Sequence, residues 1–189
     1  MQSLWAPWRA AYILGNTEAA GGCIFCVKPS RGPEHFAEDL ILCVTAEVSV
    51  MLNAFPYNNG HLLVAPRAHV ARAGGLGNAA HDALFRAVTA AAGVLERVLR
   101  TDGMNIGLNM GRVAGAGIAD HAHVHLVPRW NGDTSFMPVI GEAKVISQHL
   151  QETYAILLPH FAEFDHLANL GAGAGAADGA DSVRSVHES

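Results

Sequence analysis

Residues 120–130 read DHAHVHLVPRW, so three histidines alternate with small or apolar residues. Successive side chains of a β-strand point to opposite faces, which would set His121, His123 and His125 on one face at steps of about 6.6 Å. The residues between them would face a hydrophobic core. This alternation predicts a half-buried strand that presents three imidazoles together.

The rest of the chain supplies partners for this strand. Short β-like runs occur at residues 40–45, 48–53, 61–66 and 104–110, and an Asn-Asn-Gly turn lies before the third of them. Apolar residues recur at helical spacing after Asn78, which we expect to cap a helix that Gly103 ends. A second helix is expected at residues 146–161. Together these elements predict an α+β domain with a five-stranded antiparallel sheet and two helices.

The length of 189 residues suits one domain with appendages. We expect an N-terminal arm and a Cys-x-x-Cys knuckle segment at residues 1–39, with Trp5, Trp8 and Tyr12 packed on the domain or on a partner subunit. The α+β domain is expected at residues 40–165. Residues 166–189 are rich in Gly and Ala and are expected to be a disordered tail.

Composition narrows the function classes. The net charge is −5 and no basic run occurs, which argues against a nucleic-acid binder. Neither a signal peptide nor an apolar span of about 18 residues is visible, so no membrane association is expected. Three cysteines without a signal peptide favour a reducing cytoplasm. Charged residues make up only 15%, which suits either a subunit interface or a composition rich in alanine and glycine.

Four interpretations of the three histidines compete. They are a coincidental set of buried histidines, a His-x-His catalytic zinc site, a metal-free nucleophilic histidine with flanking imidazoles, and a nucleotide-binding module without chemistry. A coincidental set is disfavoured because burying three imidazoles on one face costs desolvation without any return.

The segment HAHVHLV resembles the signature of the histidine triad (HIT) superfamily of nucleotide hydrolases and transferases. CIFC, NGHLLVAPRAH and GLNMG also lie where that family has counterparts, and VPRWNGDTSFMPV is similar to the bacterial diadenosine tetraphosphate phosphorylase and hydrolase branch. The resemblance spans roughly residues 23–139. It implies the HIT fold and a homodimer whose sheets join into one of ten strands.

The resemblance also implies catalytic roles. His123 corresponds to the nucleophile, which attacks the α-phosphorus of a nucleotide and forms a nucleotidyl-histidine intermediate. Its other ring nitrogen must donate a proton to a carbonyl, so that the attacking nitrogen keeps its lone pair. His125 and His61 correspond to residues that bind phosphate oxygens, although core packing is the alternative for His61.

Further positions correspond to nucleotide-binding residues. Asn53 matches the family position that bonds the ribose hydroxyls, and Asn109 matches a phosphate-side contact. Both are otherwise ordinary residues at strand ends. The Gly-rich loop that contains Gly115 and Gly117 can offer backbone N–H groups to phosphate oxygens.

Bacterial relatives hold a structural zinc with four positions that here are Cys23, Cys26, His69 and His121. Two thiolates and two imidazoles would form a closed tetrahedral site. Magnesium is expected only as a companion of the polyphosphate, because no acidic cluster indicates a protein site for it.

The chain departs from the pattern of many triad hydrolases, which carry Gln and Ser where this chain has Gly117 and Ile118. Glycine at this position resembles the phosphorylase branch and leaves room for inorganic phosphate. We therefore expect phosphorolysis of diadenosine tetraphosphate to ATP and ADP, with hydrolysis as the alternative. A zinc-dependent metallohydrolase and a non-catalytic nucleotide sensor also remain open.

Overall fold

The computed structural model describes residues 22–133, 149–162 and 164. The predicted aromatic arm, the predicted tail and the beginning of the second predicted helix lie outside the described residues. None of the helices in the described part is long and apolar enough to cross a membrane.

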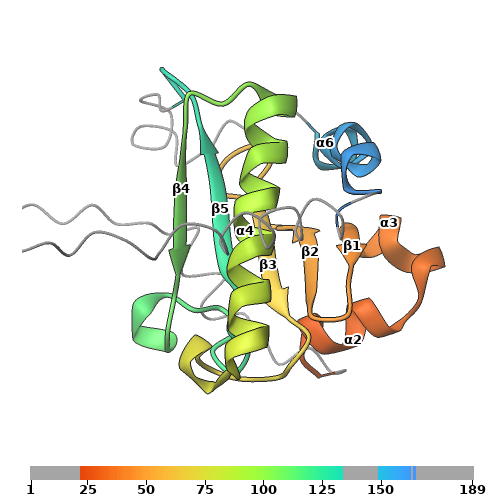
Figure 1. Cartoon of the computed structure of the whole chain (residues 1–189). Helices are drawn as coiled ribbons and strands as arrows, with labels where there is room; N and C mark the ends of the chain where they lie inside the picture. Colours follow the sequence, from red (N-terminus) through yellow and green to blue (C-terminus); the bar gives the residue numbers. More distant parts are fainter. Residues whose placement is uncertain (1–21, 134–148, 163, 165–189) are drawn as a thin grey trace, which may run out of the picture.

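A five-stranded antiparallel sheet forms the centre of the fold (Figure 1). Its strands are β1 (Ile41–Val44), β2 (Val48–Leu52), β3 (Leu62–Pro66), β4 (Gly103–Leu108) and β5 (Val124–Arg129). Their order across the sheet is β1-β2-β3-β5-β4. The predicted five-stranded antiparallel sheet is thus confirmed, with each strand close to its predicted range.

Side chains alternate between two hydrophobic clusters, one on each face of the sheet. On the middle strands, Leu62, Val64 and Leu126 belong to the large cluster beneath the long helix α4 (Asn78–Leu99). Leu63 and Ala65 point the other way and join a smaller cluster. His125 lies opposite Leu63 in the strand register, and it faces this second side. His125 therefore lies on the same face of the sheet as the smaller cluster.

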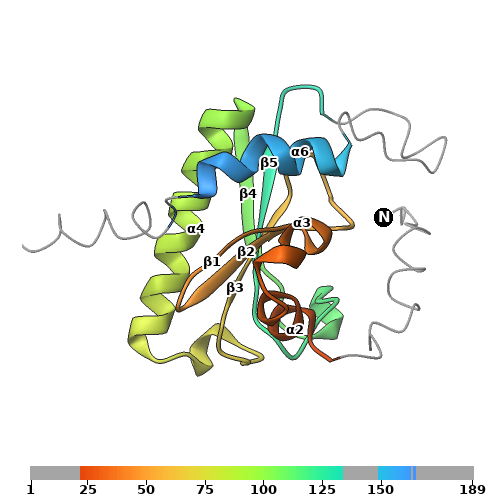
Figure 2. The same cartoon turned by 90° about the vertical axis from the view of Figure 1, so that its right-hand side faces the viewer.

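Helix α4 runs along the sheet and buries the predicted apolar stripe (Figures 1 and 2). Its ends differ from the prediction. Gly77 occupies the N-cap, and Asn78 is the first helical residue. The helix ends at Leu99, before Gly103, and Arg100 takes a left-handed conformation with a φ of +50°. The indole N–H of Trp130 donates to the carbonyls of Leu99 and Arg100 at 3.3 and 3.1 Å, which gives carbonyls at the end of the helix a hydrogen-bond partner.

The second predicted helix is present as α6 (Leu150–Leu157), followed by the 3₁₀ turn η4 (Leu158–Phe161). Tyr154, Leu157 and Phe161 join the large cluster on the α4 side. The Tyr154 hydroxyl donates to the carbonyl of Ile41 at 3.0 Å. This bond fastens α6 to the edge of the sheet that β1 forms.

Two short helices precede the sheet and were not predicted: α2 (Ile24–Ser30) and α3 (Phe36–Asp39), joined by the 3₁₀ turn η1 (Pro33–His35). The Arg31 guanidinium donates to both carboxylate oxygens of Asp39 at 3.1 Å, and Lys28 lies 3.6 Å from the same group. Asp39 is buried. The helices therefore depend on tertiary contacts across a Pro/Gly-rich stretch, which local propensity does not reveal.

The strand of histidines begins later than predicted. β5 starts at Val124, so His121 and His123 precede it. The β3–β5 register would set Ala122 opposite Pro66, which has no N–H to donate. The Ala122 N–H instead donates to the carbonyl of Val70 at 2.6 Å. The ladder therefore stops before the first two histidines.

Candidate functional site

The three histidines line one side of the sheet even though only His125 lies in a strand. The ring of Phe25 contacts both His121 and His123, with centroids 5.2 and 4.7 Å apart. The rings of His123 and His125 lie 4.9 Å apart. The predicted grouping on a single face therefore holds, and Phe25 of α2 lies against two of its members.

His123 has a defined tautomer. Its Nδ1 atom lies 2.8 Å from the carbonyl oxygen of His121, an acceptor that requires a proton on Nδ1. Burial lowers the pKa of His123, while this hydrogen bond opposes the effect. The ring is therefore neutral near pH 7, and Nε2 keeps its lone pair. The hydrogen bond to a carbonyl that a nucleophilic role requires is present.

His61 and His125 form a directed chain of hydrogen bonds. The backbone N–H of Tyr57 donates to His61 Nδ1 at 3.0 Å, so a neutral His61 carries its proton on Nε2. His61 Nε2 lies 2.9 Å from His125 Nδ1 and donates to it. The proton of a neutral His125 is consequently placed on its own Nε2.

His125 Nε2 is buried and has no hydrogen-bond partner among the described residues. A buried N–H without an acceptor costs about 1–3 kcal/mol. Burial, followed by the nearby charge of His123, lowers the pKa of His125 to about 4. His125 therefore offers an uncharged N–H donor beside the His123 ring, and an incoming acceptor oxygen would satisfy it.

The turn before His61 sets the position of this chain. Gly60 has a φ of +70°, and a Cβ at this position would clash with the side chain of Leu99. The Tyr57 ring then lies near His61 and His125, with centroid distances of 4.8 and 5.9 Å. The predicted Asn-Asn-Gly turn is thus confirmed, and it requires glycine at its last residue.

The other predicted nucleotide-binding residues fall into two groups. Asn53 lies beside His61, with its amide nitrogen 3.3 Å from His61 Nδ1. Asn109 follows β4, whose register would set it opposite His123, and its amide donates to the Gly115 carbonyl at 3.5 Å. Gly115 has a φ of +86° at the end of the 3₁₀ turn η3 (Arg112–Ala114). Gly117 is half-buried in the same loop.

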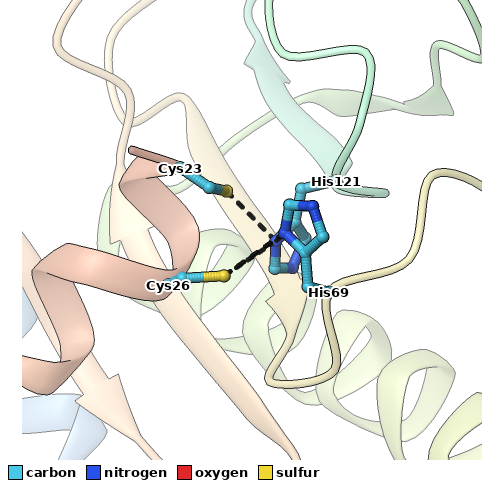
Figure 3. Close-up of side chains that lie close together, drawn as sticks. All are labelled: Cys23, Cys26, His69 and His121. Atoms are coloured by element: carbon cyan, nitrogen blue, oxygen red, sulfur yellow. Dashed lines mark hydrogen bonds between the residues drawn. The ribbon is translucent and has the colours of Figure 1, made fainter. Parts of the chain in front are cut away.

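The four predicted metal ligands converge at one point (Figure 3). Cys23 and Cys26 come from the beginning of α2, His69 from the loop after β3, and His121 from the segment before β5. Their ligand atoms all lie within 4.8 Å of one another. The Nδ1 atom of His121 is 3.2 Å from Cys23 Sγ and 3.2 Å from His69 Nδ1, and His69 Nδ1 is 3.4 Å from Cys26 Sγ.

His121 is oriented for ligation. Its Nε2 lies 2.8 Å from the carbonyl of Pro66 and donates to it, which leaves the Nδ1 lone pair directed at the two sulfurs. Burial and the neighbouring charge of Cys23 raise the pKa of Cys26 in the absence of a cation. A divalent cation would act in the opposite direction, because a metal ion favours the thiolate. The group can therefore hold a metal ion.

Two aromatic residues of the site were not predicted from the sequence. Phe25 is 1% exposed and lies against His121 and His123, and Tyr57 lies against His61 and His125. Both lie inside segments that were interpreted for other reasons, as a cysteine pair and as a turn. An aromatic residue within each of those two segments was the only indication in the sequence that the histidine rings would have aromatic neighbours.

A family model for the HIT domain matches residues 36–132. The chain is also 36% identical over 169 residues to the AP-4-A phosphorylase of Mycobacterium tuberculosis, a match that covers 86% of this chain and 85% of that protein. The chain belongs to the HIT family. Its membership confirms the resemblance that the three histidines carried.

Solved structures share the HIT fold. A histidine triad nucleotide-binding protein from Sulfolobus tokodaii aligns with a TM-score of 0.58 and 23% identity, over 84% of this chain and all of that chain. A Zn-bound histidine triad family protein from Mycobacterium smegmatis aligns with a TM-score of 0.56 and 23% identity, over 77% of this chain and 96% of that chain. At this level of identity the comparison establishes the HIT fold.

Proposed function

We propose that this HIT protein is a nucleotidyltransferase that cleaves dinucleoside polyphosphates at the α-phosphorus by phosphorolysis. The observation that carries the proposal is the hydrogen bond from His123 Nδ1 to the His121 carbonyl, which leaves Nε2 as the nucleophile. The likeness of this chain to the M. tuberculosis protein named AP-4-A phosphorylase supports this substrate class.

The reaction would proceed in two displacements. His123 Nε2 attacks the α-phosphorus of diadenosine tetraphosphate, a P–N bond forms, and the bond to the bridging oxygen breaks to release ATP. An oxygen of inorganic phosphate then attacks the adenylyl group, the P–N bond breaks, and ADP leaves. His123 returns to its starting state after each cycle.

His125 would stabilise the negative charge that develops in both displacements. Its Nε2–H is buried, uncharged and without an acceptor among the described residues, so a phosphoryl oxygen would complete its hydrogen bonding. His61 orients His125 through the bond between His61 Nε2 and His125 Nδ1. Asn53, next to His61, would bind the ribose hydroxyls, and Asn109 with the loop at Gly115 and Gly117 would contact phosphate oxygens.

The choice of phosphate over water as the acceptor is supported by the loop before His121. Gly117 carries no side chain where hydrolases of the family have Gln. Ile118 packs against the cluster that contains Phe25, so this position supplies an apolar contact and no polar group to position a water molecule. Magnesium would enter with the polyphosphate, since the metal group of the described residues contains no carboxylate.

The Cys/His group would hold a structural zinc. In a tetrahedral site with Zn–S of about 2.3 Å and Zn–N of about 2.0–2.1 Å, neighbouring ligand atoms lie roughly 3.3–3.8 Å apart. Four of the six separations between ligand atoms are 3.2–3.5 Å, close to these values, and all four ligand atoms lie within 4.8 Å of one another. With four protein ligands the site would be closed, which supports a structural role and disfavours a catalytic metal on His123 and His125.

The exposed edge of the sheet supports the homodimer. β4 is the last strand of the sheet, and Ile106 on it and Met110 just beyond it are 50% and 52% exposed. Pairing of β4 with its copy would cover this edge and extend the sheet to ten strands. Sedimentation equilibrium should give a dimer for the wild-type protein, and Ile106→Glu should shift it towards monomer.

Product analysis tests the proposed activity. The protein is incubated with diadenosine tetraphosphate with and without inorganic phosphate, and the nucleotides are separated by chromatography. Phosphorolysis gives ATP and ADP and requires phosphate. AMP with ATP in the absence of phosphate would identify a hydrolase instead, and binding without turnover of any dinucleoside polyphosphate would identify a sensor.

A further inference from the structure

The Cys-x-x-Cys segment contributes to the metal group and also contacts His123, the proposed nucleophile. Phe25 lies between the two cysteines at the beginning of α2 and is 1% exposed. Its ring lies 4.7 Å from that of His123 at an interplanar angle of 34°. The same ring lies 5.2 Å from His121. One buried side chain therefore contacts a metal ligand and the proposed nucleophile.

The backbone around Phe25 is fixed by the knuckle itself. The N–H groups of Cys26 and Val27 donate to the Cys23 carbonyl at 3.0 and 2.9 Å. A metal bound to both sulfurs would hold the flanks of this turn in place, and the ring of Phe25 would be held with them. A second connection runs through His121, whose side chain belongs to the metal group while its carbonyl accepts the His123 Nδ1 proton.

We propose that Phe25 is a positioning residue through which metal occupancy of the Cys/His group fixes the ring orientation of His123. This inference rests on the proposed function only in naming His123 as the nucleophile. Phe25 touches no reacting atom. It limits the rotation of the His123 ring about its side-chain bonds, and Nε2 keeps its direction towards phosphorus.

Phe25→Leu tests the proposal because leucine retains most of the apolar burial but removes the flat ring. Phe161→Leu is the matched control: Phe161 is 2% exposed and packs in the large cluster against Phe164, on the other face of the sheet. Both variants should lose similar thermal stability. Phe25→Leu should retain bound zinc and KM, while its kcat falls roughly 10- to 100-fold, as for residues that orient a reactive group from outside it. Phe161→Leu should retain kcat.

Nuclear magnetic resonance of protein with ¹⁵N-labelled histidine rings gives a readout that does not depend on activity. In the zinc-loaded wild type, His123 should show one sharp tautomer with its proton on Nδ1. Chelation of zinc, or Phe25→Leu in the loaded protein, should broaden or shift these signals, while the exposed His81 on α4 serves as the unaffected reference. Phe25→Met gives a second variant if the leucine protein does not fold.

The proposal is overturned if the His123 signals are the same in loaded and chelated protein, or if Phe25→Leu retains wild-type kcat. It is also overturned if Phe161→Leu loses as much kcat as Phe25→Leu. Because the resonance experiment reads the ring directly, it still decides the proposal if the protein turns over no dinucleoside polyphosphate. In that case the proposed function fails while the coupling between Phe25 and His123 is tested on its own.

Discussion

His123 donates its Nδ1 proton to the backbone carbonyl of His121 at 2.8 Å. The hydrogen bond joins two residues of one short segment whose side chains have different partners. The His121 side chain belongs to the Cys/His group, and the His123 ring keeps its Nε2 lone pair. His121 therefore contacts the Cys/His group through its side chain and His123 through its backbone carbonyl.

Removing the proposed nucleophile should stop turnover. His123→Ala should lower kcat by about 10⁴-fold or more, as the loss of a nucleophile does in other enzymes, because no P–N bond can form. The Kd for a nucleotide, measured by calorimetry, should change little. His81→Ala, at a 47% exposed site on α4, is the control and should retain activity. Turnover by His123→Ala at the wild-type rate would contradict the assignment.

Removing the buried donor of His125 should slow both displacements, because each would develop negative charge on the oxygens of the α-phosphorus. His125→Ala should lower kcat on diadenosine tetraphosphate by about 10²-fold, the low end of the range for proton-transfer and donor groups. The fold loss should be similar on the p-nitrophenyl ester of AMP, because the adenylyl oxygens that would accept from His125 are the same in both substrates. Steady-state kinetics on both substrates provide the measurement. A loss on diadenosine tetraphosphate alone would contradict contact of His125 with the adenylyl phosphate.

Loss of both knuckle thiols should remove the metal without unfolding the chain. The double variant Cys23→Ser, Cys26→Ser should bind no zinc by elemental analysis, and its Tm should fall by about 5–10 °C if the site contributes about 2–3 kcal/mol. The fold should persist because Arg31 and Asp39 hold α2 on α3 independently. Cys43→Ser, in β1, is the control and should bind one zinc. Full zinc occupancy in the double variant would refute the ligand assignment.

Stability should fall in mild acid. The pKa of His125 is about 4 in the folded protein, against about 6.5 for an unfolded histidine. Between these values the unfolded state binds more protons, so the free energy of unfolding from His125 falls as the pH decreases from about 6.5 to about 4. Urea unfolding at pH 7.5, 6 and 5 measures this slope. His125→Gln should show a shallower slope, and an unchanged slope would contradict the predicted effect.

The sequence predicted the sheet well because the strands are short apolar runs bounded by turn signals. The residues of β2 and β3 are buried on both faces of the sheet, so these strands stand out as nearly continuous apolar runs without knowledge of the partner strands. The ends of α4 were less predictable. Asn78 suits an N-cap by propensity, but the chain enters the helix at Gly77, and Trp130 from a distant loop caps the other end.

The site was predicted in its residue types more than in its connections. The resemblance to the HIT family indicated the four residues of the Cys/His group and the phosphate-binding role of His61 and His125, whereas the hydrogen bond between His61 and His125 was not predicted. The contacts of Phe25 and Tyr57 with the histidine rings have no such signal, since a sequence does not show which aromatic residue will lie against a distant histidine. The helices α2 and α3 were not predicted, because an ion pair between the exposed Arg31 and the buried Asp39 stabilises them and local propensity does not show it.

Pro66 limits the pairing of β3 with β5 because proline has no backbone N–H to donate. With any other residue at position 66, β3 and β5 could pair for one more step. The Pro66 carbonyl, which now accepts from the His121 side chain, could then accept from a backbone N–H instead. Strand pairing stops at Val124, so His123, the proposed nucleophile, lies on a segment that is not paired with a neighbouring strand. The orientation of its ring therefore depends on the His121 carbonyl and on the packing of Phe25, and a change at either contact would alter the direction of Nε2 without any change in the sheet.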